Sequence, residues 1–295
     1  MMNKTTRLLS LLVLGSLMTA CAVADPDVAD DGTDGKADGI TDPNKMPAKI
    51  ITYENANQWG AMHLRWHTER RWDVLDPANR TWATKHGYKR AALQEGVAGN
   101  GLEFLAMHRM MMGMLRDNFP KYASLFDGWD TPPTDPRDGA DPLPNMATTA
   151  FEPKMLAAID RLENHIDSFK TDDELGLFIE TNMRPTASDP KSRSTDPSTG
   201  LHNYMHNRFM DPKSKINVGD PTVNMKNKLF WRLHGWIDAR WTAFRAAKGL
   251  SDSDPDYQAA LDAAMQNMMT PKSTDTLGTA PNDPVPSSLI DQLLQ

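Results

Sequence analysis

The sequence predicts a mainly α-helical protein whose core is an antiparallel four-helix bundle with long irregular loops. Three observations support this fold class. Apolar residues recur at three- and four-residue intervals over several long stretches, long alternating runs of β-branched residues are absent, and stretches rich in Pro, Asp, Ser and Thr separate the periodic segments. A chain of 295 residues is also long enough to bury a sizeable core.

Helical periodicity runs through five segments, which in chain order are residues 54–75, 101–118, 152–169, 173–181 and 224–248. Ahead of the fourth segment, Thr171 or Asp172 can cap the helix before Glu174. The predicted loops are residues 129–146, 185–199 and 270–287. A short apolar segment follows at 289–294.

Composition and charge exclude several classes of protein. The chain has 39 acidic and 32 basic residues and a net charge of −7, so it lacks the basic excess that binding to nucleic acid requires. Hydrophobic residues make up 39% of the chain and the mean hydropathy is negative, which excludes a protein with several membrane spans. A single cysteine excludes a disulfide framework and a cysteine-ligated zinc or iron–sulfur site.

Residues 1–21 are typical of an export signal of the lipoprotein type. One Lys and one Arg supply its positive end, and the apolar run at 8–17 is too short for a stable membrane span. Small residues precede Cys21, the only cysteine of the chain, and this pattern predicts lipidation there. Cleavage after Ala24 is the alternative, because the residues before that position also fit a signal-peptidase site.

Three further parts are expected after the signal. Residues 22–45 are rich in Asp and Gly and predict a disordered acidic tether, residues 46–250 hold the periodic helices and form the main domain, and residues 251–295 form a C-terminal extension. These features predict an exported bacterial protein, either an outer membrane lipoprotein or a periplasmic or extracellular protein. Its contact with a membrane would be limited to the N-terminal lipid anchor.

Two pairs of histidines stand four residues apart, His63 with His67 and His202 with His206. On a helix this spacing puts both imidazoles of a pair on one face, one turn apart, where they can bind one metal ion. A zinc-protease site needs a glutamate directly after the first histidine, and those positions hold Leu and Asn. The pairs therefore predict metal ligation without a hydrolytic base.

Each pair is followed by one more histidine in an apolar helical segment, His108 after the first pair and His234 after the second. Either of these alone is explained as well by a buried, hydrogen-bonded core histidine. The repeated pattern of a pair plus one predicts instead two facing sites of three neutral imidazoles, a ligand set that suits copper. The predicted ligands of this dinuclear metal site are His63, His67, His108, His202, His206 and His234.

The segments around these histidines resemble the type 3 copper family of tyrosinases, catechol oxidases and haemocyanins. LHNYMH at 201–206 resembles the opening of the family's second copper site, and FWRLHGWID at 230–238 is similar to its closing helix. FLAMHR at 104–109 is similar to the segment of the third ligand in the first copper site. The resemblance spans roughly residues 55–245.

This resemblance implies a tyrosinase-like copper domain over residues 46–250 that holds two copper ions. The implied activity is the oxidation of a small phenolic substrate with dioxygen, from o-diphenol to o-quinone. The alternative is a non-catalytic, haemocyanin-like protein of the cell envelope that binds oxygen or copper. A relative that has lost one of its metals is a third interpretation.

Departures from the family concern the first copper site. Most tyrosinases have their second ligand about nine residues before the third, where this chain has Gly99. The pair His63 and His67 is instead similar to the first site of arthropod haemocyanins and phenoloxidases. His86 is an alternative to either member of the pair, whereas His165 is most simply a framework residue.

Three further residues are expected to support the site. Phe230 lies one helical turn before the last of the six histidines, where the family often places a ring over the copper pocket, although core packing explains it equally well. Asp238, one turn after the same histidine, can pair with Arg109 or Arg240 and so fix the helices, or form an ordinary surface salt bridge. Asn203 resembles the residue that helps tyrosinases to position a water for phenol deprotonation.

Overall fold

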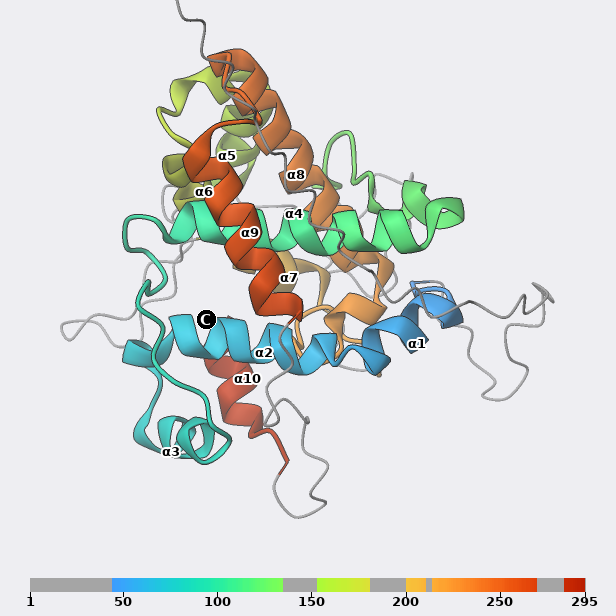
Figure 1. Ribbon diagram of the computed structural model, residues 1–295, viewed down its shortest axis with the longest axis vertical. Coiled ribbons are helices and arrows are strands. Elements are labelled where there is room, and N and C mark those ends of the chain that lie inside the picture. The colour runs from blue at the N-terminus through green and yellow to red at the C-terminus, as the bar shows by residue number, and fades with distance from the viewer. Residues whose placement is uncertain (1–43, 135–152, 181–199, 211–213, 270–283, 295) are drawn as a thin grey trace, which may run out of the picture. The chain divides into compact units, whose positions relative to one another are not determined.

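The computed structural model describes residues 44–134, 153–180, 200–210, 214–269 and 284–294, all within one compact unit that spans Ile40–Gln295. The predicted export signal with Cys21, and the tether up to residue 43, lie outside these described residues. The mainly helical fold predicted from the sequence is confirmed (Figure 1). In the described ranges, strand pairing is limited to an isolated bridge between Lys45 and Asn227. None of the described helices combines the length and the apolar character that a membrane span needs.

The α-helices are α1 (Ala48–Ala56), α2 (Trp59–Arg70), α3 (Pro77–Lys85), α4 (Asn100–Asn118), α5 (Pro153–Asn164), α6 (Asp172–Glu180), α7 (His202–Phe209), α8 (Lys228–Lys248), α9 (Pro255–Met269) and α10 (Ser287–Leu294). Short 3₁₀ turns are η1 (Trp72–Val74), η2 (Pro120–Phe126), η3 (Ile166–Ser168) and η4 (Asn224–Lys226). The sequence periodicity located α2, α4, α5, α6 and α8, but it did not predict α3 or α9. Of the predicted loops, residues 185–199 and most of the other two lie outside the described ranges.

The first predicted helix, at 54–75, is in fact interrupted. α1 ends at Ala56 and α2 begins at Trp59, because Gln58 adopts a left-handed backbone conformation (φ 55°, ψ 33°) that breaks the helical path. The periodicity continues across this break because Ile50 on one side and Trp59 on the other are buried in the same core. The first histidine pair therefore lies wholly within α2.

Helix α4 packs against α6, α8 and α9, and α8 and α9 cross it (Figure 1). The backbones of α4 and α6 are in close contact at Gly101 and Gly176, since a Cβ atom on Gly101 would lie 2.2 Å from the carbonyl oxygen of Asp173. The Asp173 carboxylate accepts hydrogen bonds from the backbone N–H groups of Gly99 (2.9 Å) and Leu102 (3.2 Å) at the start of α4. These contacts fix the start of the helix that carries His108.

Helix α8 is anchored by large aromatic side chains. Its fully buried aromatic residues are Phe230, Trp231, Trp236, Trp241 and Phe244. Each of the three indole N–H groups donates a hydrogen bond, to the carbonyl of Met225 (2.6 Å), to Glu163 (3.1 Å) and to Asp172 (2.5 Å), respectively. The rotation of α8 about its axis is therefore fixed, and with it the direction of His234.

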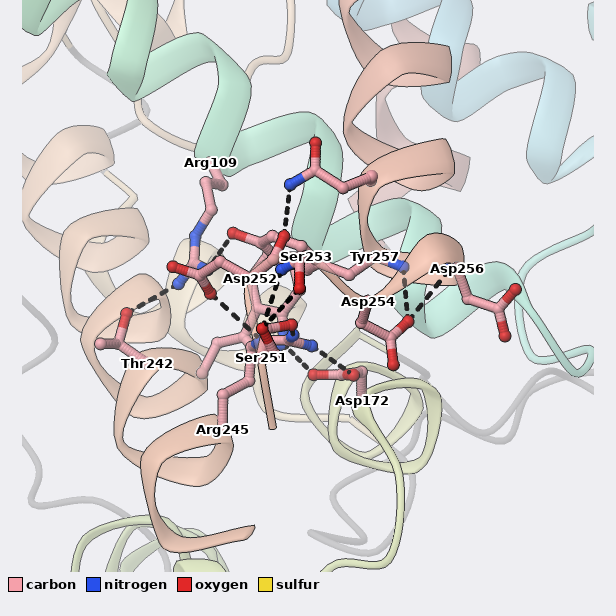
Figure 2. A network of polar contacts seen from close by, with 12 residues as sticks. Arg109, Asp172, Thr242, Arg245, Ser251, Asp252, Ser253, Asp254, Asp256 and Tyr257 are labelled. Carbon is pink, nitrogen blue, oxygen red and sulfur yellow. Dashed lines mark hydrogen bonds and ion pairs between the residues drawn. The ribbon is translucent and has the colours of Figure 1, made fainter. Parts of the chain in front are cut away.

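Residues 251–269 and 284–294, which the sequence analysis assigned to a C-terminal extension, lie in the same compact unit as the helices before them. α9 packs on α4, and a polar network joins α9 to α4, α6 and α8 (Figure 2). In this network Arg109 donates to the Tyr257 hydroxyl (3.1 Å), and Arg245 donates to Asp172 (2.7 Å) and to the Ser251 carbonyl (2.6 Å). Contacts with α9 therefore help to hold α4 and α8, the helices that carry His108 and His234.

Candidate metal centre

Four helices bring the six predicted histidine ligands together. α2 and α4 supply the first trio, which is His63, His67 and His108. α7 and α8 supply the second trio, which is His202, His206 and His234. All six side chains are buried, with exposed fractions of 9% or less.

The ring nitrogens of the two trios form one continuous cluster. Within each pair the two Nε2 atoms face each other, 3.1 Å apart in the first pair and 2.9 Å apart in the second. Nε2 of His234 lies 3.0 Å from that of His202. Ligand atoms of the first trio lie within 4.8 Å of one another, and so do those of His108, His202 and His234. His108 therefore belongs to both groups, and its ring stacks on that of His234 with the centroids 4.1 Å apart.

The two single histidines are oriented by their own helices. Nδ1 of His108 donates a hydrogen bond to the carbonyl of Phe104 one turn earlier (3.0 Å), and Nδ1 of His234 donates to the carbonyl of Phe230 (2.7 Å). Because Nδ1 carries the proton in both rings, Nε2 presents a lone pair. Such bonds from the second ring nitrogen are what fixes the tautomer and direction of histidines that bind metals.

One member of each pair is oriented by the loop between α7 and α8. Nδ1 of His63 donates to the carbonyl of Pro221 (3.2 Å), and Nδ1 of His206 donates to the carbonyl of Val218 (2.8 Å). A single loop thus directs one Nε2 atom from each side into the cluster. In total, four of the six rings have their lone pairs aimed at the centre.

This arrangement leaves nitrogen atoms without suitable partners. Nε2 of His202 lies close to two nitrogens that both present lone pairs, those of His206 and His234, and it can carry only one hydrogen. Nδ1 of His202 and Nε2 of His108 are buried and have no hydrogen-bond partner among the described residues. Lone pairs at these distances repel unless a cation lies between them, so the cluster can hold a metal ion.

Burial keeps the imidazoles in the neutral form. Removal from water lowers the pKa of His63 to about 4, although its hydrogen bond to Pro221 opposes the shift, and it also lowers the pKa of His206 to about 4. Burial, together with repulsion between the rings, places the pKa values of the other four well below the ordinary 6.5. Because metals bind neutral imidazole, these rings need not lose a proton to bind one at neutral pH.

A small pocket opens onto the cluster. It is lined by the four histidines of the two pairs and by Asn203, Asn224 and Leu293, together with Gly219 and Pro221. Its free volume is about 20 Å³, room for roughly one water molecule. A molecule in this pocket lies next to histidines of both trios.

Helix α10 covers this pocket. Leu293 contributes to the lining, and its carbonyl accepts hydrogen bonds from the guanidinium of Arg71 and from Nδ2 of Asn203 (3.4 Å). Gln292 exchanges two hydrogen bonds with Asp76 at the start of α3 (3.1 and 2.9 Å). α10 is therefore held by polar contacts to residues that follow α2 and to α7.

The supporting residues expected from the sequence lie at or near the cluster. The ring of Phe230 is 3.9 Å from that of His234 and 5.5 Å from that of His63, so it lies among the imidazoles of both trios. Asn203 is buried and faces the pocket. Asp238 accepts a hydrogen bond from Arg109 (2.5 Å), which also donates to other residues of the network in Figure 2. This ion pair joins α4 to α8.

The remaining two histidines, the alternative ligand His86 and the framework residue His165, lie outside the cluster. His86 stacks on Trp82 with the ring centroids 4.0 Å apart, and its Nδ1 donates to the carbonyl of the same residue (2.8 Å). His165 is exposed and lies 3.7 Å from the carboxylate of Asp160. Gly99, where most tyrosinases have a ligand, is the N-cap of α4 with φ at 94°.

Several groups at the pocket were not identified from the sequence. These are the lining residues Asn224 and Leu293 and the carbonyls of Val218 and Pro221. Gly and Pro mark the loop as a turn, but no local pattern connects a turn to a histidine 158 residues earlier. Only contacts between distant parts of the chain reveal their place.

Comparison with known proteins assigns no family to the chain, because it matches no protein-family model and no curated protein. The resemblance to the type 3 copper family therefore depends on the motifs quoted above. The cluster geometry adds an independent argument for a metal site.

Proposed function

We propose that the protein is a copper-dependent oxidoreductase of the type 3 copper class, which oxidises o-diphenols to o-quinones with dioxygen. The observation that carries this proposal is the cluster of six buried imidazoles, contributed as a pair plus one from each side. Two copper ions would supply the redox chemistry, in which two diphenols give four electrons and four protons to one dioxygen, forming two quinones and two waters. Three imidazoles per ion leave a position free for an exogenous ligand.

The chain's own contribution is orientation of the ligands and exclusion of water. The Nδ1 hydrogen bonds to backbone carbonyls direct the Nε2 lone pairs of four rings inward. The rings of Phe104 and Phe230 are fully buried and lie against histidines of both trios, so they exclude water from the side of the cluster that they cover. Asn203 is in position to hold a water at the pocket, the role that the family resemblance suggests for it.

Access of an aromatic substrate requires movement of α10. A pocket of about 20 Å³ holds roughly one water and cannot hold a phenol ring. Leu293 lines this pocket together with the histidines, so it limits the space next to them. The proposed oxidase therefore requires that the contacts of Leu293 with Arg71 and Asn203 break when the substrate enters.

The same observation favours a second candidate function, a haemocyanin-like protein that binds copper and oxygen without turning over a phenol. Dioxygen is much smaller than a phenol and needs less displacement of α10, and a fixed α10 would exclude larger molecules. The two candidates differ in whether a diphenol reaches the histidines.

Either function suits an exported protein, and lipidation at Cys21 is part of the proposal.

Copper analysis and catechol oxidation by the copper-loaded protein test both candidates, with Leu293→Ala as the informative variant. Burial of a leucine side chain is worth about 2 kcal/mol, so its removal should ease displacement of α10 and raise the rate of quinone formation by up to about thirtyfold. The matched control is Leu156→Ala in α5, an exposed leucine whose loss should leave the rate unchanged.

The outcomes separate the candidates clearly. Two copper ions per chain with quinone formation, faster in Leu293→Ala, supports the oxidase. Two copper ions with reversible oxygen uptake and no quinone in either protein supports the oxygen binder. Fewer than two copper ions per chain contradicts the dinuclear site on which both depend.

A further inference from the structure

The two single histidines are each tied to their own helix. His108 donates from Nδ1 to a carbonyl one turn earlier in α4, and His234 does the same in α8. Each ring therefore keeps its direction relative to the helix that carries it. The distance between the two stacked rings, 4.1 Å between centroids, follows the packing of α4 against α8.

Arg109 connects these two helices beside the rings. It directly follows His108 in α4, and its Nε donates to the carboxylate of Asp238 (2.5 Å), one turn after His234 in α8. Its Nη2 donates to the carbonyl of Asp238 (3.2 Å) and to the hydroxyl of Thr242 (2.7 Å), a contact shown in Figure 2. Because the guanidinium is planar and rigid, several bonds to one helix fix orientation as well as distance.

Helix α9 holds the same guanidinium from another side. Nη1 of Arg109 donates to the hydroxyl of Tyr257 in α9 (3.1 Å), and the guanidinium carbon lies 3.9 Å from the ring centroid of Trp241 in α8. The side chains of Arg109 and Asp238 are 17% and 16% exposed, so their ion pair is partly shielded from water. Arg109 is thus held by both α8 and α9.

A second arginine of α4 gives a useful contrast. Arg116 lies two turns after Arg109, and its Nη1 is 3.9 Å from the carboxylate of Asp238, which is beyond hydrogen-bond distance. Its Nη2 donates instead to the carbonyl of Phe126 in η2 (2.6 Å). Arg116 therefore keeps a positive charge near Asp238 without bonding α4 to α8 beside the histidines.

We propose that Arg109 is a positioning residue that sets the separation of the two metal ions by fixing α4 against α8 at the level of His108 and His234. Each trio takes its single ligand from one of these helices, so a wider gap between the helices moves the two ions apart. The proposed function needs both ions close enough to act on one dioxygen. This inference rests on the proposed function, because it takes the cluster to hold two copper ions.

The copper–copper separation in the copper(II)-loaded protein, measured by X-ray absorption, tests the proposal. Arg109→Met loses the bonds to α8 and α9, so the separation should increase while two ions remain bound. Electron paramagnetic resonance provides a second measurement, since copper(II) ions coupled through a shared ligand give little signal and separated ions give a strong one. Arg109→Lys keeps the charge but not the planar fork, so it should fall between the unaltered protein and Arg109→Met.

The matched control is Arg116→Met, which removes an arginine from the same helix and a charge near the same carboxylate. It leaves the bonds of Arg109 in place, so the separation and the resonance signal should not change. Tyr257→Phe removes one hydrogen bond and keeps the ring, and should increase the separation less than Arg109→Met does. Copper content and the free energy of unfolding are measured for every variant, so that a loss of stability is not mistaken for a change of position.

The outcomes are distinct. An unchanged separation in Arg109→Met with two ions bound removes the role of Arg109 and leaves the proposed function intact. An equal increase in Arg116→Met shows general loosening of α4 and also overturns the proposal. If Arg109→Met no longer holds two ions, Arg109→Lys decides, and an unchanged separation there overturns the proposal. Failure of the unaltered protein to bind two copper ions removes the proposed function, and the role of Arg109 with it.

Discussion

The first pair of histidines lies in the middle of the 12-residue α2, whereas the second pair lies on the eight-residue α7, which begins at His202 itself. The single histidines are more alike. Each lies on a long helix, α4 or α8, and each donates from Nδ1 to the carbonyl of a phenylalanine one turn earlier. The two trios thus share one plan for their single ligands but differ in how the chain holds their pairs.

The difference shows how much of a metal site can be set by local structure. Isolated helices shorter than about 12 residues are marginal in water, and Leu201, the N-cap of α7, provides no side-chain hydrogen bond to the helix. α7 is instead held by contacts from elsewhere, such as the bond from the Leu201 N–H to the carbonyl of Ile179 (2.8 Å) and that from His206 to Val218. The second pair therefore depends more on the rest of the fold than the first.

Removal of a single histidine should have the largest effect and tests whether the trios are separate. His108→Ala should cost the protein most of its copper, because this ring belongs to both groups of ligand atoms. His234→Ala should remove only the second copper and abolish oxygen chemistry. Copper per chain is the measurement, and His165→Ala, on an exposed ring, should keep both ions. If His234→Ala loses both ions and His108→Ala only one, then His108 is not the shared ligand.

Acid should affect both trios of the metal-free protein alike. His63 and His206, one from each trio, have folded pKa values of about 4, below the ordinary 6.5. The unfolded chain therefore binds more protons between these values, and the free energy of unfolding should fall as pH decreases from about 6.5 to about 4, by as much as roughly 3 kcal/mol for each ring. Denaturant titrations at several pH values measure this. A free energy of unfolding that stays constant over that interval would contradict the burial of neutral imidazoles.

Hydrogen exchange should show the difference between the pairs, as the smallest of these effects. Removal of copper with a chelator should speed amide exchange in α7 by about tenfold, since this short helix loses a contact that helps to order it. Exchange in α2 should change less, because its histidines lie within a longer helix packed in the core. Equal acceleration in α2 and α7 would show that helix length does not decide how the pairs are held.

Part of the fold and of the candidate metal site could be predicted from the sequence alone. The mainly helical fold was predicted correctly, and so was the placing of the two histidines of each pair on one helix, α2 or α7, because four-residue spacing on a helix is a local property. The break at Gln58 was missed, since apolar residues continue on both sides of it. The choice between His86 and the first pair could not be made from spacing, and it was the packing of His86 on Trp82 that placed this ring outside the cluster.

By itself, the amino-acid order determined which residues share a helical face, because one turn of helix relates neighbours three and four positions apart whatever surrounds them. Only the tertiary structure decided that His108 stands between the two trios, that two loop carbonyls orient rings on both sides, and that Leu293 and Asn224 enclose the pocket. Those arrangements join residues as far as 222 positions apart, as Arg71 and Leu293 are. Contacts over such separations form only when the whole core packs, so no short stretch of sequence contains them.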